Sequence, residues 1–130
     1  MILVDTSALY AAYVYTDRNH HKAVAWFQNN VEPLITTNFI VAEVLTLLRS
    51  RHRLAEAQDL SLRLRSNSIV IEWITESDFQ EAWRICDEFA DKLWSFVDCL
   101  SYVVISRLQL TTAFAFDEHF RQFGMVTVVP

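Results

Sequence analysis

The chain is 130 residues long and carries 11 Lys and Arg against 16 Asp and Glu, which gives a net charge of -5 at pH 7. Hydrophobic residues make up 52% of it and charged residues 21%, a balance that excludes a disordered or low-complexity protein. The single glycine, Gly124, excludes the phosphate-binding loops of nucleotide-binding proteins, because such loops need several glycines close together. Bulk acidity alone would also argue against nucleic-acid binding.

The length fits one domain, residues 1–130, with a core large enough to need no disulfide framework. The two cysteines, Cys86 and Cys99, lie in apolar helical patterns and are predicted to be buried free thiols. The first ten residues lack the positively charged lead of a signal peptide. No segment approaches the roughly 20 apolar residues that cross a bilayer. We therefore expect a cytoplasmic protein with no membrane partner.

Short apolar runs alternate with longer segments of helical period, a pattern typical of an α/β domain with a parallel sheet. Strands are predicted at residues 2–4, 34–36, 69–74, 112–116 and 126–129. Helices are predicted at residues 7–14, 20–30, 38–51, 54–65 and 96–108, with a further helix opening at Thr75. Asp78, three residues after Thr75, completes a capping box for that helix.

Two aspartates follow predicted strands. Asp5 comes directly after the apolar run Ile2–Val4, and Asp117 comes after Ala113–Phe116. Open parallel sheets bind their ligands at the carboxyl ends of the strands, so both positions are candidates for a functional site. Capping of the following helix is the alternative for each, because Asp favours the N-cap position.

Two further carboxylates lie on predicted helices. Glu43 shares a helix face with the apolar Phe39 and Leu47. Because burial of an unpaired carboxylate costs several kcal/mol or forces protonation, a metal ligand or paired carboxylate is favoured over a glutamate that reaches solvent. Asp98 follows Ser95 at capping-box spacing, and a carboxylate in a first helical turn keeps an oxygen free for a cation.

Together, these four carboxylates predict a hard-cation site. Mg²⁺ and Mn²⁺ prefer oxygen ligands, and clustered carboxylates repel one another unless a cation is present. Phosphodiester hydrolysis is the reaction that uses such a site best, because the cation can activate a water molecule and stabilise charge on the phosphoryl oxygens. That the four side chains meet in space is a hypothesis.

The ordered motifs Val4-Asp5-Thr6-Ser7, Glu43, Ser95-Phe96-Val97-Asp98 and Phe116-Asp117-Glu118-His119-Phe120 resemble the PIN domain, most closely its VapC-type toxins, over the whole chain. The resemblance implies a three-layer α/β/α fold with a central, mainly parallel sheet, and an Mg²⁺- or Mn²⁺-dependent ribonuclease. It implies that the catalytic and metal-site residues are Asp5, Glu43, Asp98 and Asp117, with Thr6 and Ser95 as supporting hydroxyls. It further implies an RNA substrate, a VapB-like antitoxin that places a basic segment in the acidic cleft, and a homodimer.

Histidines and arginines supply the remaining candidates. His119 neighbours Asp117 and could assist proton transfer, although a solvated helix face is the preferred interpretation. His20 and His21 are adjacent and point about 100° apart on a helix, which disfavours a zinc site. Five of the 11 basic residues lie between Arg49 and Arg65. This span predicts either an RNA-backbone surface or a solvated helical hairpin, whose leucines could also hold a partner helix.

The sequence therefore predicts a metal-dependent endoribonuclease that is the toxin of a toxin–antitoxin pair. One alternative is a catalytically inactive PIN-like module that binds RNA or protein. Another is a metal phosphohydrolase, but Asp5-Thr6-Ser7 lacks the second aspartate of DxDx[TV] phosphatases. Without the four site carboxylates, 12 acidic residues stand against 11 basic ones, so the acidic net charge no longer argues against an RNA substrate.

Overall fold

The computed structural model describes residues 1–130 and contains a five-stranded parallel sheet in the order β3-β2-β1-β4-β5. The strands are β1 (Ile2–Val4), β2 (Leu34–Thr37), β3 (Val70–Glu72), β4 (Thr112–Phe114) and β5 (Thr127–Val129). The helices are α1 (Thr6–Tyr13), α2 (His20–Asn29), α3 (Asn38–Ser50), α4 (Leu54–Arg65), α5 (Glu76–Glu88), α6 (Phe96–Leu108) and α7 (His119–Gln122).

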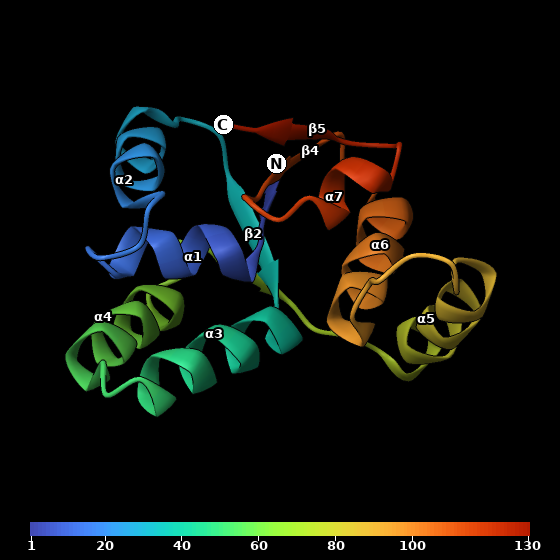
Figure 1. The fold of residues 1–130 in the computed structure, drawn as a ribbon, viewed down its shortest axis with the longest axis horizontal. Helices are drawn as coiled ribbons and strands as arrows, with labels where there is room; N and C mark the ends of the chain where they lie inside the picture. The colour runs from blue at the N-terminus through green and yellow to red at the C-terminus, as the bar shows by residue number, and fades with distance from the viewer.

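Helices cover both faces of the sheet, with α1 to α4 on one side and α5 to α7 on the other (Figure 1). The alternation of side chains along β1 accounts for these layers. Ile2 and Val4 pack into the cluster that includes residues of α1, α3 and α4, whereas Leu3 packs with Ile105 of α6 and Phe120 of α7. The predicted three-layer α/β/α fold is confirmed.

The strand order defines where a ligand can bind. The chain starts with the central strand β1. Strands β2 and β3 follow towards one edge of the sheet, and β4 and β5 then lie towards the opposite edge. The boundary between β1 and β4 is therefore the topological switch point, and in parallel sheets the crevice at the carboxyl ends beside such a point is the usual ligand site. Asp5 directly follows β1, and Asp117 lies shortly after β4.

Side chains end two strands earlier than the apolar pattern predicts. Beyond β3, the backbone N–H of Ile74 donates to Asn38 Oδ1 at 2.8 Å instead of to a neighbouring strand. Beyond β4, the N–H of Phe116 donates to Ser7 Oγ at 2.9 Å. Both strands therefore leave the ladder where polar side chains take over their hydrogen bonds, so the predicted strands 69–74 and 112–116 shorten to β3 and β4.

The helices follow their capping signals closely. The predicted boundaries of α4 and α6 are the observed ones, and the predicted capping box of Thr75 and Asp78 opens α5. The four-residue α7 is the one helix that the apolar period does not predict, since it is too short to show a period. None of the helices combines the length and the apolar character needed to cross a membrane.

Candidate metal centre

Asp5 is a buried carboxylate at the start of α1, where it is the N-cap residue. Its Oδ2 accepts hydrogen bonds from the backbone N–H of Ser7 at 3.2 Å and from Ser7 Oγ at 2.8 Å. Burial raises the pKa of Asp5 to about 7; the Ser7 hydrogen bonds oppose this rise and the negative charge of Asp98 adds to it. Asp5 is therefore both a cap and a carboxylate that gives up its proton near neutral pH.

Asp98 is buried in the first turn of α6, where a reciprocal capping box fixes it. The N–H of Ser95 donates to Asp98 Oδ2 at 3.0 Å, and the N–H of Asp98 donates to Ser95 Oγ at 3.1 Å. The hydrogen bonds expected of Ser95 are thus present. Capping occupies one lone-pair direction of the carboxylate and leaves others for a ligand.

Asp117 and His119 bring the loop after β4 against Asp98. The N–H of His119 donates to Asp117 Oδ1 at 2.8 Å, and His119 Nδ1 lies 2.8 Å from Asp98 Oδ2 and 3.4 Å from Asp117 Oδ1. Potential ligand atoms of the three residues all lie within 4.8 Å of one another. The interpretation of His119 as part of a solvated helix face is wrong, because its ring contacts the carboxylates of Asp98 and Asp117, which we call the acidic group together with Asp5.

Ser7 is a supporting residue that the sequence reasoning did not select. Its hydroxyl donates to Asp5 and accepts from the N–H of Phe116, so it ties the first turn of α1 to the chain beyond β4. The signal was available in the spacing, because an N-cap aspartate commonly binds the residue two positions later. Thr6, which was selected, is buried, and its Oγ1 has no hydrogen-bond partner.

Glu43 is half-buried on α3, between the half-buried Phe39 and Leu47 on its helix face. Its carboxylate makes no hydrogen bond or ion pair with Asp5, Asp98 or Asp117, and neither Glu43 nor Asp5 belongs to the 4.8 Å group of Asp98, Asp117 and His119. Its helix begins directly after β2, which neighbours β1 in the sheet. A role for Glu43 in the site stays a prediction.

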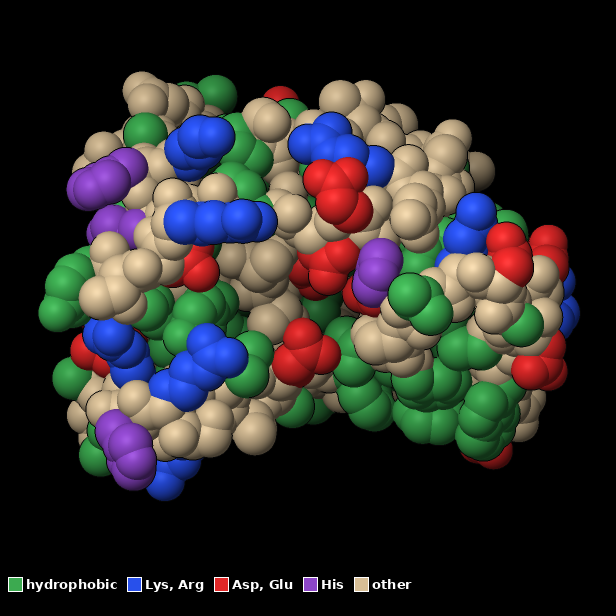
Figure 2. All heavy atoms as spheres, in the orientation of Figure 1, with side chains coloured by type: hydrophobic (Ala, Val, Ile, Leu, Met, Phe, Trp, Pro, Cys, Tyr) green, Lys and Arg blue, Asp and Glu red, His purple; other side chains and the backbone are tan.

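No lysine or arginine forms an ion pair with the acidic group; His119 is its basic neighbour. Figure 2 shows acidic side chains gathered in a hollow at the centre of this face, with lysines and arginines mostly towards one side. A donor set of carboxylate oxygens suits Mg²⁺ or Mn²⁺, and the unpartnered Thr6 Oγ1 beside Asp5 is a further oxygen without a protein partner. The residues present therefore fit a divalent cation.

The sequence matches the PIN domain family over residues 2–125. The chain belongs to this family. It is 33% identical over 132 residues to the "23S rRNA-specific endonuclease VapC20" of two Mycobacterium tuberculosis strains, covering 100% of this chain and 99% of that protein. The crystal structure of the M. tuberculosis VapC20, described as a sarcin–ricin loop cleaving toxin, superimposes with a TM-score of 0.93 at 28% identity over the whole of both chains.

Two more distant structures share the fold alone. FitAcB from Neisseria gonorrhoeae matches with a TM-score of 0.72 at 17% identity over 100% of this chain and 97% of that one. PAE2754 from Pyrobaculum aerophilum matches with a TM-score of 0.66 at 20% identity over 98% and 90%. The PIN family, the fold and a metal-dependent PIN ribonuclease of the VapC toxin type, all predicted from the sequence, are thereby confirmed.

Proposed function

We propose that this PIN ribonuclease cleaves 23S rRNA in the sarcin–ricin loop and is the toxin of a toxin–antitoxin pair. The observation that carries the proposal is the full-length agreement with VapC20, which holds in sequence at 33% identity and in structure at a TM-score of 0.93. The acidic group at the switch point of the sheet supports the same conclusion, because it lies where parallel sheets bind substrates.

Asp5, Asp98 and Asp117 would hold the cation, Mg²⁺ or Mn²⁺, and Glu43 would complete the acidic set. When bound, the ion supplies Lewis acidity and offsets negative charge on the phosphoryl oxygens of the RNA. Ser7 orients Asp5 Oδ2, while the capping box and His119 Nδ1 orient Asp98 Oδ2. Because burial raises the pKa of Asp5 to about 7, this carboxyl is partly protonated near neutral pH and would give up its proton on holding a cation.

Two arginines form the surface that would contact the RNA backbone. Arg51 donates to the hydroxyl of Tyr10 at 2.7 Å and lies 5.0 Å from the centre of its ring. Arg53 lies 5.4 Å from the ring of Tyr15 and bonds Thr16 on the same side of the molecule. No carboxylate neutralises either guanidinium, so both remain available to phosphate groups.

The other half of the predicted basic span is less suited to this role. Arg63 pairs with Asp59, and Arg65 donates to the carbonyl of Ser61 on its own helix. We therefore assign the RNA contact to the Arg51 and Arg53 side of the hairpin.

The proposal includes a VapB-like antitoxin whose basic segment neutralises the acidic hollow, a homodimer, and action in the cytoplasm.

A cleavage assay on a synthetic sarcin–ricin hairpin tests the proposal. Wild-type protein should cut the hairpin at one position with Mn²⁺ or Mg²⁺ and not with EDTA, and should leave a hairpin with a scrambled loop intact. Asp98→Asn should slow the cut by roughly 100- to 1000-fold. Asp91→Asn is the matched control, because the side chain of Asp91 is 73% exposed and its one ion pair is with the adjacent Lys92.

Equal cleavage of both hairpins would contradict the proposed target. Cleavage at an undiminished rate in EDTA or in Asp98→Asn would contradict the metal site. Binding of the hairpin without any cut would favour the inactive RNA-binding module instead.

A further inference from the structure

Two cysteines face each other between α5 and α6. Cys86 lies in the last turn of α5 and Cys99 in the first turn of α6, and their Sγ atoms are 2.7 Å apart. This separation is shorter than the roughly 3.5–4.0 Å of ordinary nonbonded contacts between carbon atoms. It is longer than the about 2.05 Å of a disulfide bond. The thiols are free, and a small relative movement would join them.

The surroundings of the sulfurs make them unequal. Cys99 is 1% exposed, among Leu100, Val103 and other apolar side chains of the two helices, whereas Cys86 is half-buried. An oxidant in solvent therefore reaches Cys86 first. Neither sulfur belongs to a group of three metal-binding side chains, which argues against a metal site at the pair.

We propose that Cys86 and Cys99 are a reversible redox pair, which a peroxide converts to an intramolecular disulfide and which thereby lowers ribonuclease activity. Cys86 sulfur attacks hydrogen peroxide and breaks its O–O bond, giving a sulfenic acid and one water molecule. Cys99 sulfur then attacks the sulfenic sulfur, forms the S–S bond and releases the second water. The two thiols lose two electrons and two protons, and the peroxide is reduced to two water molecules.

The position of Cys99 couples this bond to the acidic group. Cys99 directly follows Asp98, and its N–H donates to the carbonyl of Ser95 in the same first turn of α6. Closing the bond requires the sulfurs to approach by roughly 0.65 Å, a movement that the two side chains and the first turn of α6 would share. A misplacement of about 1 Å in a catalytic site can cost on the order of 100-fold in rate. This coupling rests on the proposed role of Asp98.

Mass spectrometry after peroxide treatment tests the bond itself. The intact protein should lose two hydrogens, both thiols should become unreactive towards a thiol reagent added after denaturation, and dithiothreitol should reverse both changes. The linked peptides should contain Cys86 and Cys99 from one chain. Cys86→Ser and Cys86→Ala should show no such loss. Thiols that stay reactive, or a disulfide between two chains on a nonreducing gel, would overturn the proposal.

Cleavage rates test the coupling. After removal of peroxide, the oxidised protein should cleave RNA with Mn²⁺ at least roughly tenfold more slowly than the reduced protein, and dithiothreitol should restore the rate. The rate of Cys86→Ser should be insensitive to the treatment. A fully cross-linked protein with an unchanged rate would overturn the coupling. The mass measurement needs no RNA, so a failed redox pair and a wrong RNA target give different results.

Discussion

Two helices of this molecule open with the same local device and use it differently. Thr75 and Asp78 form a capping box at the start of α5, and Ser95 and Asp98 form one at the start of α6. In each box the aspartate accepts from the backbone of the cap residue at 3.0–3.1 Å. The difference lies in the remaining partner of each aspartate.

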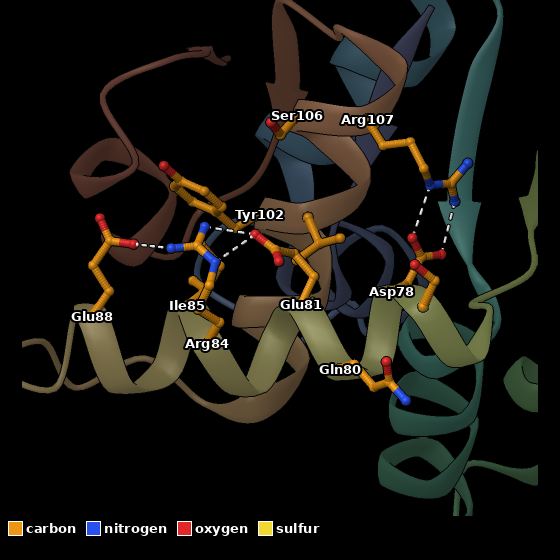
Figure 3. A pocket seen from close by; sticks show the side chains of 11 residues that line it. Asp78, Gln80, Glu81, Arg84, Ile85, Glu88, Tyr102, Ser106 and Arg107 are labelled. Atoms are coloured by element: carbon orange, nitrogen blue, oxygen red, sulfur yellow. Dashed lines mark hydrogen bonds and ion pairs between the residues drawn. The ribbon is translucent and has the colours of Figure 1, made fainter.

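Arg107 neutralises Asp78 permanently. Its Nε and Nη2 donate to the two oxygens of Asp78 at 2.8 and 2.9 Å, as Figure 3 shows, and its Nη1 donates to Glu72 at 3.0 Å. Burial favours the neutral form of Asp78, but the hydrogen bonds from Arg107 and Thr75, together with the charge of Arg107, outweigh burial and hold the pKa of this carboxyl below its ordinary value. This capping box therefore belongs to an internal ion network.

Asp98 has no such cation. Its neighbours are His119, Asp117 and Asp5, and the pKa of Asp5 is raised rather than lowered. The two boxes share the local motif and differ in the permanent cation, so the proposed metal site is at the box whose aspartate has no arginine partner.

The largest expected effect is a difference in the rate of RNA cleavage between variants of Asp98 and of Asp78. Asp98→Asn should lower the rate of RNA cleavage by roughly 100- to 1000-fold, because loss of a metal ligand removes several kcal/mol of transition-state stabilisation. The amide oxygen of asparagine can still accept the hydrogen bond from the Ser95 N–H, so the midpoint of thermal unfolding should change little. Asp78→Asn is the matched variant: it should lower that midpoint and leave the rate of the folded protein within about twofold. Initial rates and thermal melts check both, and equal loss of activity in the two variants would erase the distinction.

The two regions should also respond to pH with opposite signs. The folded pKa of Asp5, about 7, lies above its ordinary value of 3.8, so between these pH values the folded state holds a proton that the unfolded state has lost. The contribution of Asp5 to the unfolding free energy is therefore greatest below pH 4 and declines, by roughly 2–4 kcal/mol, as pH rises to 7. The lowered pKa of Asp78 acts the other way, since its contribution disappears as the pH falls.

Urea unfolding of the protein in EDTA, between pH 5 and 8, measures this dependence. Subtracting the curve of Asp5→Asn from that of the wild type isolates the contribution of Asp5. A difference that is constant across this range would contradict the raised pKa.

Removing the permanent cation should destabilise the fold without affecting the chemistry. Arg107→Met leaves the buried Asp78 unpaired and should lower the unfolding free energy by about 2–3 kcal/mol, less than at a fully buried pair because Arg107 is 38% exposed. Arg84→Met is the control, since its partners Glu81 and Glu88 are largely exposed, and its loss should be clearly smaller. Chemical denaturation compares them, and equal losses would show that the Asp78 pair is no stronger than a surface pair.

The smallest effect concerns the one basic group at the acidic site. His119→Ala should slow cleavage roughly tenfold, as expected for a residue that orients a ligand rather than holding the ion. Asp98 keeps its capping box, which limits the loss. His119→Gln, which can still donate a hydrogen bond, should recover part of the rate. His21→Ala, at an exposed position on α2, should have no effect. An unchanged rate of RNA cleavage in His119→Ala would show that His119 has no role in the site.

The parts of the structure that sequence predicted are those that local interactions decide. The capping spacings of Thr75 and Ser95 place the starts of α5 and α6 correctly, and the apolar runs place all five strands. The apolar face of Glu43 favours a metal ligand or paired carboxylate over a glutamate that reaches solvent; the structure leaves Glu43 half-buried, and its role in the site stays a prediction. Local pattern decides which side chains share a helix face, and packing decides how deeply they are buried.

Contacts between distant segments could not be predicted in the same way. His119 reaches Asp98 across 21 residues, and Arg107 reaches Asp78 across 29. Nothing in the two capping motifs reveals which of them has a basic partner, because the packing of α6 against α5 and β4 decides it. Ser7 is the exception, since its bond to Asp5 is local and its spacing could have identified it.

The order of the strands has a consequence for how the nuclease is made. Ile2 of β1 pairs with Thr112 of β4, so the central strand acquires its second neighbour only after most of the other elements have been synthesised. On a translating ribosome, Asp5 and Asp98 emerge before Asp117, and the loop that brings Asp117 to them follows β4. Since the chain emerges from its N-terminus, the group of Asp98, Asp117 and His119 can form only late, when little more than β5 remains to emerge. A nascent chain therefore lacks this group until residues 117–119 have left the exit tunnel.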